Sequence, residues 1–387
     1  MRYEDFTATS PGILVPTVFD AKAFVPDALP PHIDLADIAL TLGEARGRLG
    51  ELRGACRRLQ NPFIFIRPLQ RLEAQTSSAM EGTFTTVQKL ALAESGVAEN
   101  ADDDTKEVSN YILALNNAVD SIENEPITHR TLKAAHKTLL GGVGKLRGED
   151  KLPGEFKRDQ NMIGGITLDK ARFIPPPPKE TLDCVSQLEK FINADRGTDL
   201  ALIDIALAHY QFETIHPFAD GNGRVGRMLV SLMAVSKGLL DIPALYVSPE
   251  LERKKDTYID KLYRVSAFAE WTEWLNFFFK ATADACITSI ATIDAIISLQ
   301  EQYRVRAAEA SNSANIQRII DMLFEVPAVR TKDVVRQIGI TDAAARGLLT
   351  KLVEIGILKE FDVVYPKAWI ASELLNVTSP SRPSSTH

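Results

Sequence analysis

The stretch of this 387-residue sequence that is richest in reactive groups lies between residues 216 and 227 and reads His-Pro-Phe-Ala-Asp-Gly-Asn-Gly-Arg-Val-Gly-Arg. Gly221 and Gly223 lack a Cβ atom, so the backbone can turn sharply there and bring its N–H groups close to a ligand. Arg224 and Arg227 are three residues apart and would share one face of a helix. Backbone N–H groups and two guanidinium groups together predict an anion site, which suits a polyphosphate better than a single carboxylate.

The residues on either side predict that one helix ends before this loop and that another begins within it. Before the loop, apolar side chains recur on one helical face, at Leu200, Ile203, Leu207 and Tyr210. After the loop, the run 228–237 is apolar again and is closed by Gly238. The second helix would present its unpaired first-turn N–H groups and the positive end of its dipole to the anion.

Each polar residue of the loop has a role that its chemistry suggests. His216 could act as a general base, and Asp220 could hold Mg²⁺, because Mg²⁺ on phosphates needs only one or two protein carboxylates. Asn222 and the loop amides could stabilise charge on a phosphate, while Arg224 and Arg227 grip the outer phosphates. The alternative is a Gly-Asn-Gly turn that merely joins two helices, with His216 buried in the core.

This segment resembles the signature of the Fic family, His-Pro-Phe-x-(Asp/Glu)-Gly-Asn-Gly-Arg-x-x-Arg, and matches it at every fixed position. The resemblance implies a mainly α-helical protein with a Fic-like core and a β-hairpin flap. It also implies an enzyme that moves AMP from ATP to a Ser, Thr or Tyr hydroxyl of a target protein, with His216 catalytic and Asp220 on Mg²⁺. The ATP-binding residues that it implies are Glu81, His216, Pro217, Phe218, Ala219, Asp220, Gly221, Asn222, Gly223, Arg224, Arg227 and Tyr258.

Tyr258 is included because Fic proteins often carry a tyrosine pair at this distance from the signature, in contact with the base. Here the pair reads Thr257-Tyr258, so one tyrosine is missing. The strictness for ATP over other nucleotides is therefore open. Transfer from a different phosphate donor is an alternative, because some Fic relatives move other groups. The other large side chains between residues 251 and 278 are expected in the core.

The segment before the core carries a glutamate that the family resemblance singles out. Five prolines between residues 7 and 33 predict an extended arm, and helices are expected from Leu35 to Leu59 and from Pro68 onward. On the second helix Ser77 and Glu81 share a face, and Gly82 can cap the end. These three residues resemble the Fic inhibitory motif (Ser/Thr)-x-x-x-Glu-(Gly/Asn). The resemblance implies that Glu81 pairs with Arg227 and keeps the γ-phosphate out of its productive place.

Residues 163–166 and 171–174 predict a hairpin whose second strand is stopped by four prolines and keeps an exposed edge. An exposed edge can hold an extended peptide by main-chain hydrogen bonds. The hairpin resembles the Fic flap, which aligns the target segment; a surface hairpin without a ligand is the alternative. His129 and His136 lie on a helix that Thr128 can cap, and both are interpreted as packing or surface residues.

The last hundred residues predict a linker helix and a small appended domain. Helices are expected at 287–310, 316–324, 331–338 and 341–355, followed by strands at 356–360 and 363–365. This order resembles a winged helix, whose third helix would place Arg346 and Lys351 on DNA. Eight basic and eight acidic residues balance between 313 and 373, so protein contact or a homodimer is favoured over DNA. A nucleotide-sensing transcription regulator that binds DNA is nevertheless the alternative function.

The length and composition of the chain limit the classes of protein to which it can belong. With 387 residues, 45% hydrophobic and 25% charged, the chain has the make-up of a globular protein. No apolar run approaches a bilayer span and no signal peptide is evident, so a cytoplasmic protein without a membrane partner is expected. Cys56, Cys184 and Cys286 predict reduced thiols and no zinc site. The predicted parts are an N-terminal arm and helices (1–120), a catalytic core (121–285), a linker helix (286–312), a winged-helix-like domain (313–377) and a disordered tail (378–387).

Overall fold

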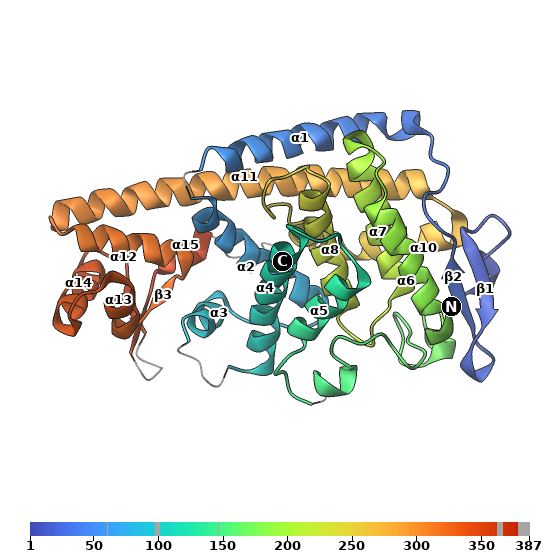
Figure 1. Cartoon of the computed structure of the whole chain (residues 1–387), viewed down its shortest axis with the longest axis horizontal. Coiled ribbons are helices and arrows are strands. Elements are labelled where there is room, and N and C mark those ends of the chain that lie inside the picture. The colour runs from blue at the N-terminus through green and yellow to red at the C-terminus, as the bar shows by residue number, and fades with distance from the viewer. Residues whose placement is uncertain (60, 97–100, 146, 362–366, 378–387) are drawn as a thin grey trace, which may run out of the picture. The chain divides into compact units, whose positions relative to one another are not determined.

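The computed structural model describes residues 1–387 except 60, 97–100, 146, 362–366 and 378–387, so the predicted disordered tail lies outside the described residues. Helices dominate the described part of the chain (Figure 1), which confirms the expected mainly α fold. The chain divides into two compact units. The first comprises Met1–Gly54 and Asn110–Ile287, and the second comprises Ala55–Ser109 and Thr288–His387.

The first unit holds the candidate loop. Its helices are α5 (His129–Leu139), α6 (Pro178–Asn193), α7 (Ala201–Ile215), α8 (Asn222–Ser236), α9 (Ser248–Arg253) and α10 (Lys255–Phe268). Its strands are β1 (Gly12–Pro16) and β2 (Lys22–Pro26). Three helices continue from one unit into the other along the chain: α1 (Ala39–Arg57), α4 (Asp103–Ile122) and α11 (Trp271–Ala310).

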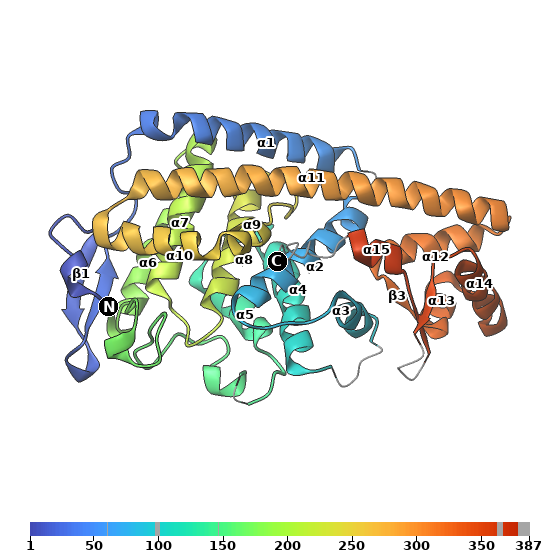
Figure 2. The ribbon, with the colours of Figure 1, turned by 180° about the vertical axis from the view of Figure 1, so that it is seen from behind.

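Helices α7 and α8 form the centre of the first unit. Every residue of α7 except Glu213 is buried, as expected for a helix that is apolar all round. It packs against both α6 and α8, and Figure 2 shows these helices from behind. At Gly226 of α8, an added Cβ atom would lie 2.2 Å from Glu213 Oε1 of α7. Glycine at this position therefore lets the two helices that flank the loop approach each other.

The N-terminal residues form a hairpin where the sequence predicted only an extended arm. Strand β1 pairs antiparallel with β2, with Leu14 opposite Phe24. The hairpin packs on the predicted flap: Phe24 N–H donates to the Ile174 carbonyl at 2.9 Å, and the Phe24 and Phe173 ring centroids are 5.8 Å apart. Tyr263 of α10 joins the same apolar cluster.

This packing corrects the prediction that the second flap strand has an exposed edge. Ile174 is fully buried, and its carbonyl is paired with β2. The two strand runs of the flap pair less extensively than the sequence predicted. A single antiparallel bridge joins Ile163 to Phe173, and a 3-10 turn at Leu168–Lys170 forms the tip. Ile166, on the other strand run, is exposed.

The second unit contains α2 (Pro62–Met80), α3 (Val87–Glu94) and the C-terminal elements. Those elements are α12 (Ala314–Glu325), β3 (Ala328–Val329), α13 (Thr331–Ile338), α14 (Asp342–Glu354), β4 (Lys359–Phe361), β5 (Ala368–Ile370) and α15 (Ser372–Val377). The three strands form one antiparallel sheet in the order β3-β5-β4. The predicted helices here are confirmed, with Thr341 capping α14 and Gly339 left-handed at φ 76°. The strand predicted at 363–365 lies outside the described residues, and assignment as a winged helix stays a prediction.

Helix α2 begins at Pro62, so the predicted start at Pro68 was wrong. Pro68 lies inside the helix. The helix forms despite the missing N–H donor because Ile64, Phe65 and Leu69 are buried on it, and tertiary packing outweighs the local penalty. Within the same unit, α2 packs against α12.

Helix α11 is longer than the linker helix that the sequence predicted, because it continues back to Trp271. In the part of the chain that the structure describes, it alone is long and apolar enough to cross a membrane, with a mean hydropathy of 1.4 over 18 residues. The prediction that no apolar segment approaches the length of a bilayer span was therefore wrong. However, 44% of that window is buried, and core helices pass the same test, so one such helix is weak evidence for a membrane span.

Candidate active site

His216 stands where α7 ends and the loop begins. Its backbone is left-handed, with φ 47° and ψ 60°, and its N–H closes the last turn of α7 on the Phe212 carbonyl. The ring atom Nδ1 lies 3.2 Å from the carbonyl oxygen of Glu213. Because a carbonyl oxygen can only accept, Nδ1 carries the hydrogen and the neutral ring has its lone pair on Nε2. This is the tautomer that a general base at Nε2 requires.

The loop closes on itself through Asn222 and Phe218. The Asn222 side chain accepts from Phe218 N–H at 2.8 Å and donates to the Phe218 carbonyl at 2.8 Å, and Asn222 is 2% exposed. The structure thus gives the Asn222 amide a bracing function within the loop. Direct contact of this amide with a phosphate stays a prediction.

Asp220 and Gly221 form the turn into α8. Gly221 is the N-cap at φ 75°, in the left-handed region that favours glycine, and its N–H donates to Asp220 Oδ1 at 2.6 Å. Arg224 Nη2 lies 3.5 Å from the same oxygen. Asp220 keeps 42% of its side chain exposed, whereas Arg224 and Arg227 are each 2% exposed. The loop thus combines one accessible carboxylate with two buried arginine side chains at a helix N-terminus, and the predicted grip of these arginines on phosphates stays a prediction.

The donor set of the loop is compatible with Mg²⁺. The contacts of the Asp220 carboxylate with Gly221 N–H and with Arg224 Nη2 both involve Oδ1. The other carboxylate oxygen, Oδ2, belongs to the same half-exposed side chain. Among the described residues there is no cluster of three or more His, Cys, Asp or Glu side chains of the kind that holds a metal ion alone. A cation at Asp220 would therefore need most of its ligands from phosphates and water, which is usual for Mg²⁺.

Two residues before the flap hold the loop, and sequence reasoning missed both. Lys157 donates from its backbone N–H to the Pro217 carbonyl at 2.8 Å and from Nζ to the Ile215 carbonyl at 3.2 Å. Asn161 Nδ2 donates to the carbonyls of His216 at 2.9 Å and Phe218 at 3.1 Å. These carbonyls belong to the last residue of α7 and to the residues after it, so no helical N–H is available to them. Burial lowers the pKa of Lys157 to about 7.

His136, which was interpreted as a packing or surface residue, is a buried packing residue, and it packs against the loop. The residue is fully buried, and its ring stacks on Phe218 with centroids 4.0 Å apart and planes at 12°. Its Nε2 is 3.0 Å from the Asp220 carbonyl, and Gly154 N–H donates to its Nδ1 at 2.9 Å. Burial lowers the pKa of His136 to about 4, so the ring is neutral near pH 7. Eighty-four residues separate His136 from Asp220, so no local pattern could have revealed this contact.

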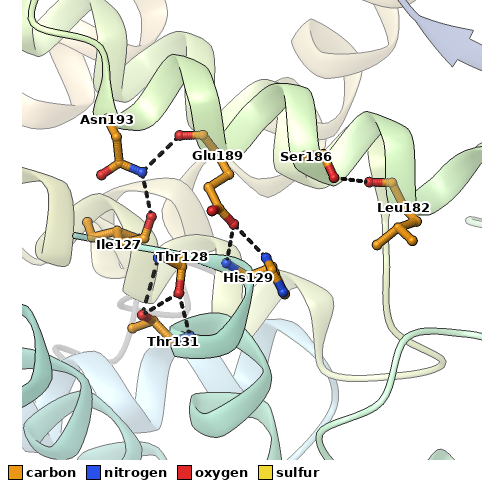
Figure 3. A network of polar contacts seen from close by, with 8 residues as sticks. All are labelled: Ile127, Thr128, His129, Thr131, Leu182, Ser186, Glu189 and Asn193. Atoms are coloured by element: carbon orange, nitrogen blue, oxygen red, sulfur yellow. Dashed lines mark hydrogen bonds and ion pairs between the residues drawn. The ribbon is translucent and has the colours of Figure 1, made fainter. Parts of the chain in front are cut away.

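Helix α5, which carries His136, is fixed to α6 at its start (Figure 3). Glu189 Oε2 accepts from both the backbone N–H and Nδ1 of His129, each at 2.7 Å. Asn193 Nδ2 donates to the Ile127 carbonyl at 2.7 Å, and Thr128 caps the helix as predicted. These contacts account for His129 as a structural residue, which agrees with its interpretation from the sequence.

Tyr258 lies in the core at 4% exposure. Its hydroxyl is 3.0 Å from Nε2 of His209, and Nδ1 of His209 is 3.0 Å from the Gly226 carbonyl. Nδ1 therefore carries the hydrogen, and the Tyr258 hydroxyl donates to Nε2. Burial lowers the pKa of His209 to about 3. Tyr258 thus has a structural function through His209, and its predicted contact with adenine stays a prediction.

The predicted inhibitory residues belong to the second unit. Helix α2 ends at Met80, and Gly82 is left-handed at φ 83°. Gly82 N–H donates to the Ala79 carbonyl and Thr83 N–H to the Ser78 carbonyl, each at 3.0 Å, which is the Schellman pattern. The prediction that Gly82 caps this helix is confirmed. Ser77 is buried and Glu81 is exposed, while the pairing of Glu81 with Arg227 stays a prediction.

The fold and the loop define a helical protein in which a glycine-containing turn joins two buried helices. Family comparisons agree: the Fic/DOC family N-terminal model matches residues 40–120, and the Fic/DOC family model matches residues 126–234. A Fic family protein from Desulfovibrio desulfuricans has a similar structure, with a TM-score of 0.56 and 18% identity, covering 89% of this chain and 98% of that one. Fic-1 from C. elegans gives a TM-score of 0.50 and 21% identity, covering 68% of this chain and 74% of that one.

The chain belongs to the Fic family. At these identities the solved structures establish a shared fold alone. A sequence relative is the protein adenylyltransferase Fic of Drosophila sechellia, which is 28% identical over 226 residues, 57% of this chain. The chain spans only 41% of that relative's length.

Proposed function

We propose that this protein transfers AMP from ATP to a Ser, Thr or Tyr hydroxyl of a target protein. The observation that carries the proposal is the Nδ1–H···O contact from His216 to Glu213, because it leaves the basic lone pair of the neutral ring on Nε2, in the residue that begins the loop. The name of the Drosophila relatives, protein adenylyltransferase, supports the same activity.

In the proposed reaction, the target hydroxyl oxygen attacks the α-phosphorus of ATP and His216 Nε2 takes its proton. The bond from the α-phosphorus to the bridging oxygen breaks, and pyrophosphate leaves. Arg224 and Arg227 hold the β- and γ-phosphates, and the first N–H groups of α8 meet the charge that develops on the α-phosphate. Asp220 would hold Mg²⁺, which would neutralise phosphate charge.

Regulation by Glu81 is part of the proposal. Glu81 competes with the γ-phosphate for Arg227, so ATP binds in a pose that presents the α-phosphate poorly. Support comes from the motif Ser77-x-x-x-Glu81-Gly82 and from the match of the family's N-terminal model to residues 40–120. The target protein is held, in this proposal, on the flap beside Ile166 and not on the strand that β2 covers.

A DNA-binding regulator with a nucleotide-sensing core is the second candidate. The order of elements from α12 to β5 supports it, since this order resembles that of a winged helix. Against it, the predicted reader Arg346 forms a 2.6 Å ion pair with Asp342 on its own helix, and the charges of the segment balance. A homodimer or another protein partner at this segment is the proposal that we favour.

The experiment is incubation of the full chain with ATP labelled at the α-phosphate, Mg²⁺ and a cell lysate, with γ-labelled ATP alongside. Transfer of the α-label alone indicates nucleotidyl transfer, because the γ-label leaves with pyrophosphate. His216→Ala should lower the rate by about 10²- to 10⁴-fold while ATP binding persists, since the phosphate cradle does not use the base. A pure sensor would transfer neither label, and full labelling by His216→Ala would show that the base is misassigned.

A further inference from the structure

Beneath the loop, the Asp220–Gly221 peptide has a partner that holds its orientation. His136 Nδ1 accepts from Gly154 N–H at 2.9 Å, so Nδ1 holds a lone pair. The hydrogen of the neutral ring is then on Nε2, which donates to the Asp220 carbonyl at 3.0 Å. The buried ring also stacks on Phe218, which prevents it from turning away.

The orientation of this peptide decides where the Asp220 carboxylate points. A trans peptide is planar, with its C=O and N–H directed to opposite sides. With the Asp220 carbonyl directed at His136, the Gly221 N–H of the same peptide points the other way, where it donates to Asp220 Oδ1 at 2.6 Å. The His136 contact and the carboxylate contact therefore use the two ends of one rigid unit.

Without such a partner, the peptide could rotate at low cost. Gly221 is at φ 75°, and glycine populates positive and negative φ about equally. A Cβ at Gly221 would lie 3.4 Å from His136 Cδ2 and 3.3 Å from Leu139, so the ring also packs against the glycine itself. His136 thus limits the one residue of the turn that has the most conformational freedom.

We propose that His136 is a positioning residue for the transfer reaction: its Nε2–H fixes the Asp220–Gly221 peptide and thereby aims the Asp220 carboxylate at the cation on the phosphates. This inference rests on the proposed function of the loop. His136 itself touches neither nucleotide nor cation. Residues that orient a metal ligand in this way change metal affinity or activity by about 10- to 100-fold when they are removed.

The test compares His136→Leu and His136→Gln in the Glu81→Gly background, with His129→Leu as the matched control on the same helix. His129 contacts Glu189 and not the loop. Titration of Mn²⁺ in the presence of ATP, followed by electron paramagnetic resonance, measures cation affinity without turnover. We expect about 10-fold weaker Mn²⁺ binding in His136→Leu, substantial recovery in His136→Gln, whose amide can donate to the same carbonyl, and no change in His129→Leu.

Two readouts keep the inference separate from the proposed function. If the Glu81→Gly parent transfers no label, the proposed function is wrong, but the Mn²⁺ titration still tests the positioning of Asp220. A folded His136→Leu variant with the parent's Mn²⁺ affinity would overturn the inference. Nitrogen NMR of the parent should find the hydrogen of His136 on Nε2 at pH 7. An Nδ1–H tautomer would overturn the inference as well, even if His136→Leu failed to fold.

Discussion

The Asn161 side-chain amide donates a hydrogen bond to the carbonyl oxygen of His216 at 2.9 Å, and the same group reaches the Phe218 carbonyl. Asn161 precedes the flap, so one residue joins the backbone of the proposed base to the segment proposed to hold the target. Flap and loop therefore share a support, and a change that loosens Asn161 is expected to affect both stability and transfer.

Replacing Asn161 with Leu should lower the free energy of unfolding by about 1–3 kcal/mol, because the His216 carbonyl loses this donor and the Phe218 carbonyl keeps only the one from Asn222. Label transfer should fall as well, since His216 is then held less firmly. Urea unfolding and initial rates measure the two effects. Asp159→Leu, at an exposed position of the same segment, is the control. Equal behaviour of the two variants would show that the Asn161 contacts contribute little.

Lys157 should make stability rise with pH above neutrality. Burial lowers its pKa from 10.5 to about 7 in the folded chain, so the unfolded chain binds more protons between these values. Stability then increases with pH across this window, by about 2 kcal/mol between pH 7 and pH 9 at roughly 1.4 kcal/mol per pH unit. Urea unfolding at both pH values, for the wild type and Lys157→Met, isolates this contribution. A pH dependence that survives in Lys157→Met would assign it to other groups.

His209 should make the fold sensitive to acid. Burial lowers its pKa to about 3, so below its unfolded pKa of about 6.5 the unfolded chain takes up a proton that the folded chain does not. The stability contribution is therefore present above that pH and is lost as the pH falls, by about 2 kcal/mol at pH 5. His209→Gln should lose that much less stability than the wild type between pH 7 and pH 5. The comparison uses the pH dependence alone, so a lower overall stability of the variant does not affect it.

The features that the sequence predicted correctly are those coded by neighbouring residues. The Thr128 cap, the left-handed Gly339 and the Gly82 Schellman turn each depend on a few adjacent positions. The contacts of His136 and Lys157 with the loop, and of β2 with Ile174, join residues far apart in the chain. The periodicity of apolar residues carries no information about such distant pairs. Between Pro62 and Pro68, tertiary packing keeps the chain helical although Pro68 favours the start of a helix.

Glu81→Gly is the variant that decides whether Glu81 inhibits the transfer reaction. A charge-assisted hydrogen bond is worth about 1.5–3 kcal/mol, or roughly ten- to a hundred-fold in an equilibrium. ATP can compete with an inhibitory contact of that strength, so the affinity for ATP should change little. Positioning of the α-phosphate supplies much of the rate, so transfer should rise at least about ten-fold.

The backbone at this position tolerates the change. Glu81 follows the last residue of α2 and is exposed, so Glu81→Gly leaves the buried face of the helix intact. Glu81→Ala provides a second variant that removes the carboxylate without adding glycine flexibility, and it should be activated as well. The double variant Glu81→Gly with Arg227→Ala should lose the gain, because the guanidinium that Glu81 would have occupied is absent. Initial rates at saturating ATP for the wild type and these variants test the proposal. If neither Glu81 variant is faster than the wild type, Glu81 is an ordinary residue at a helix end.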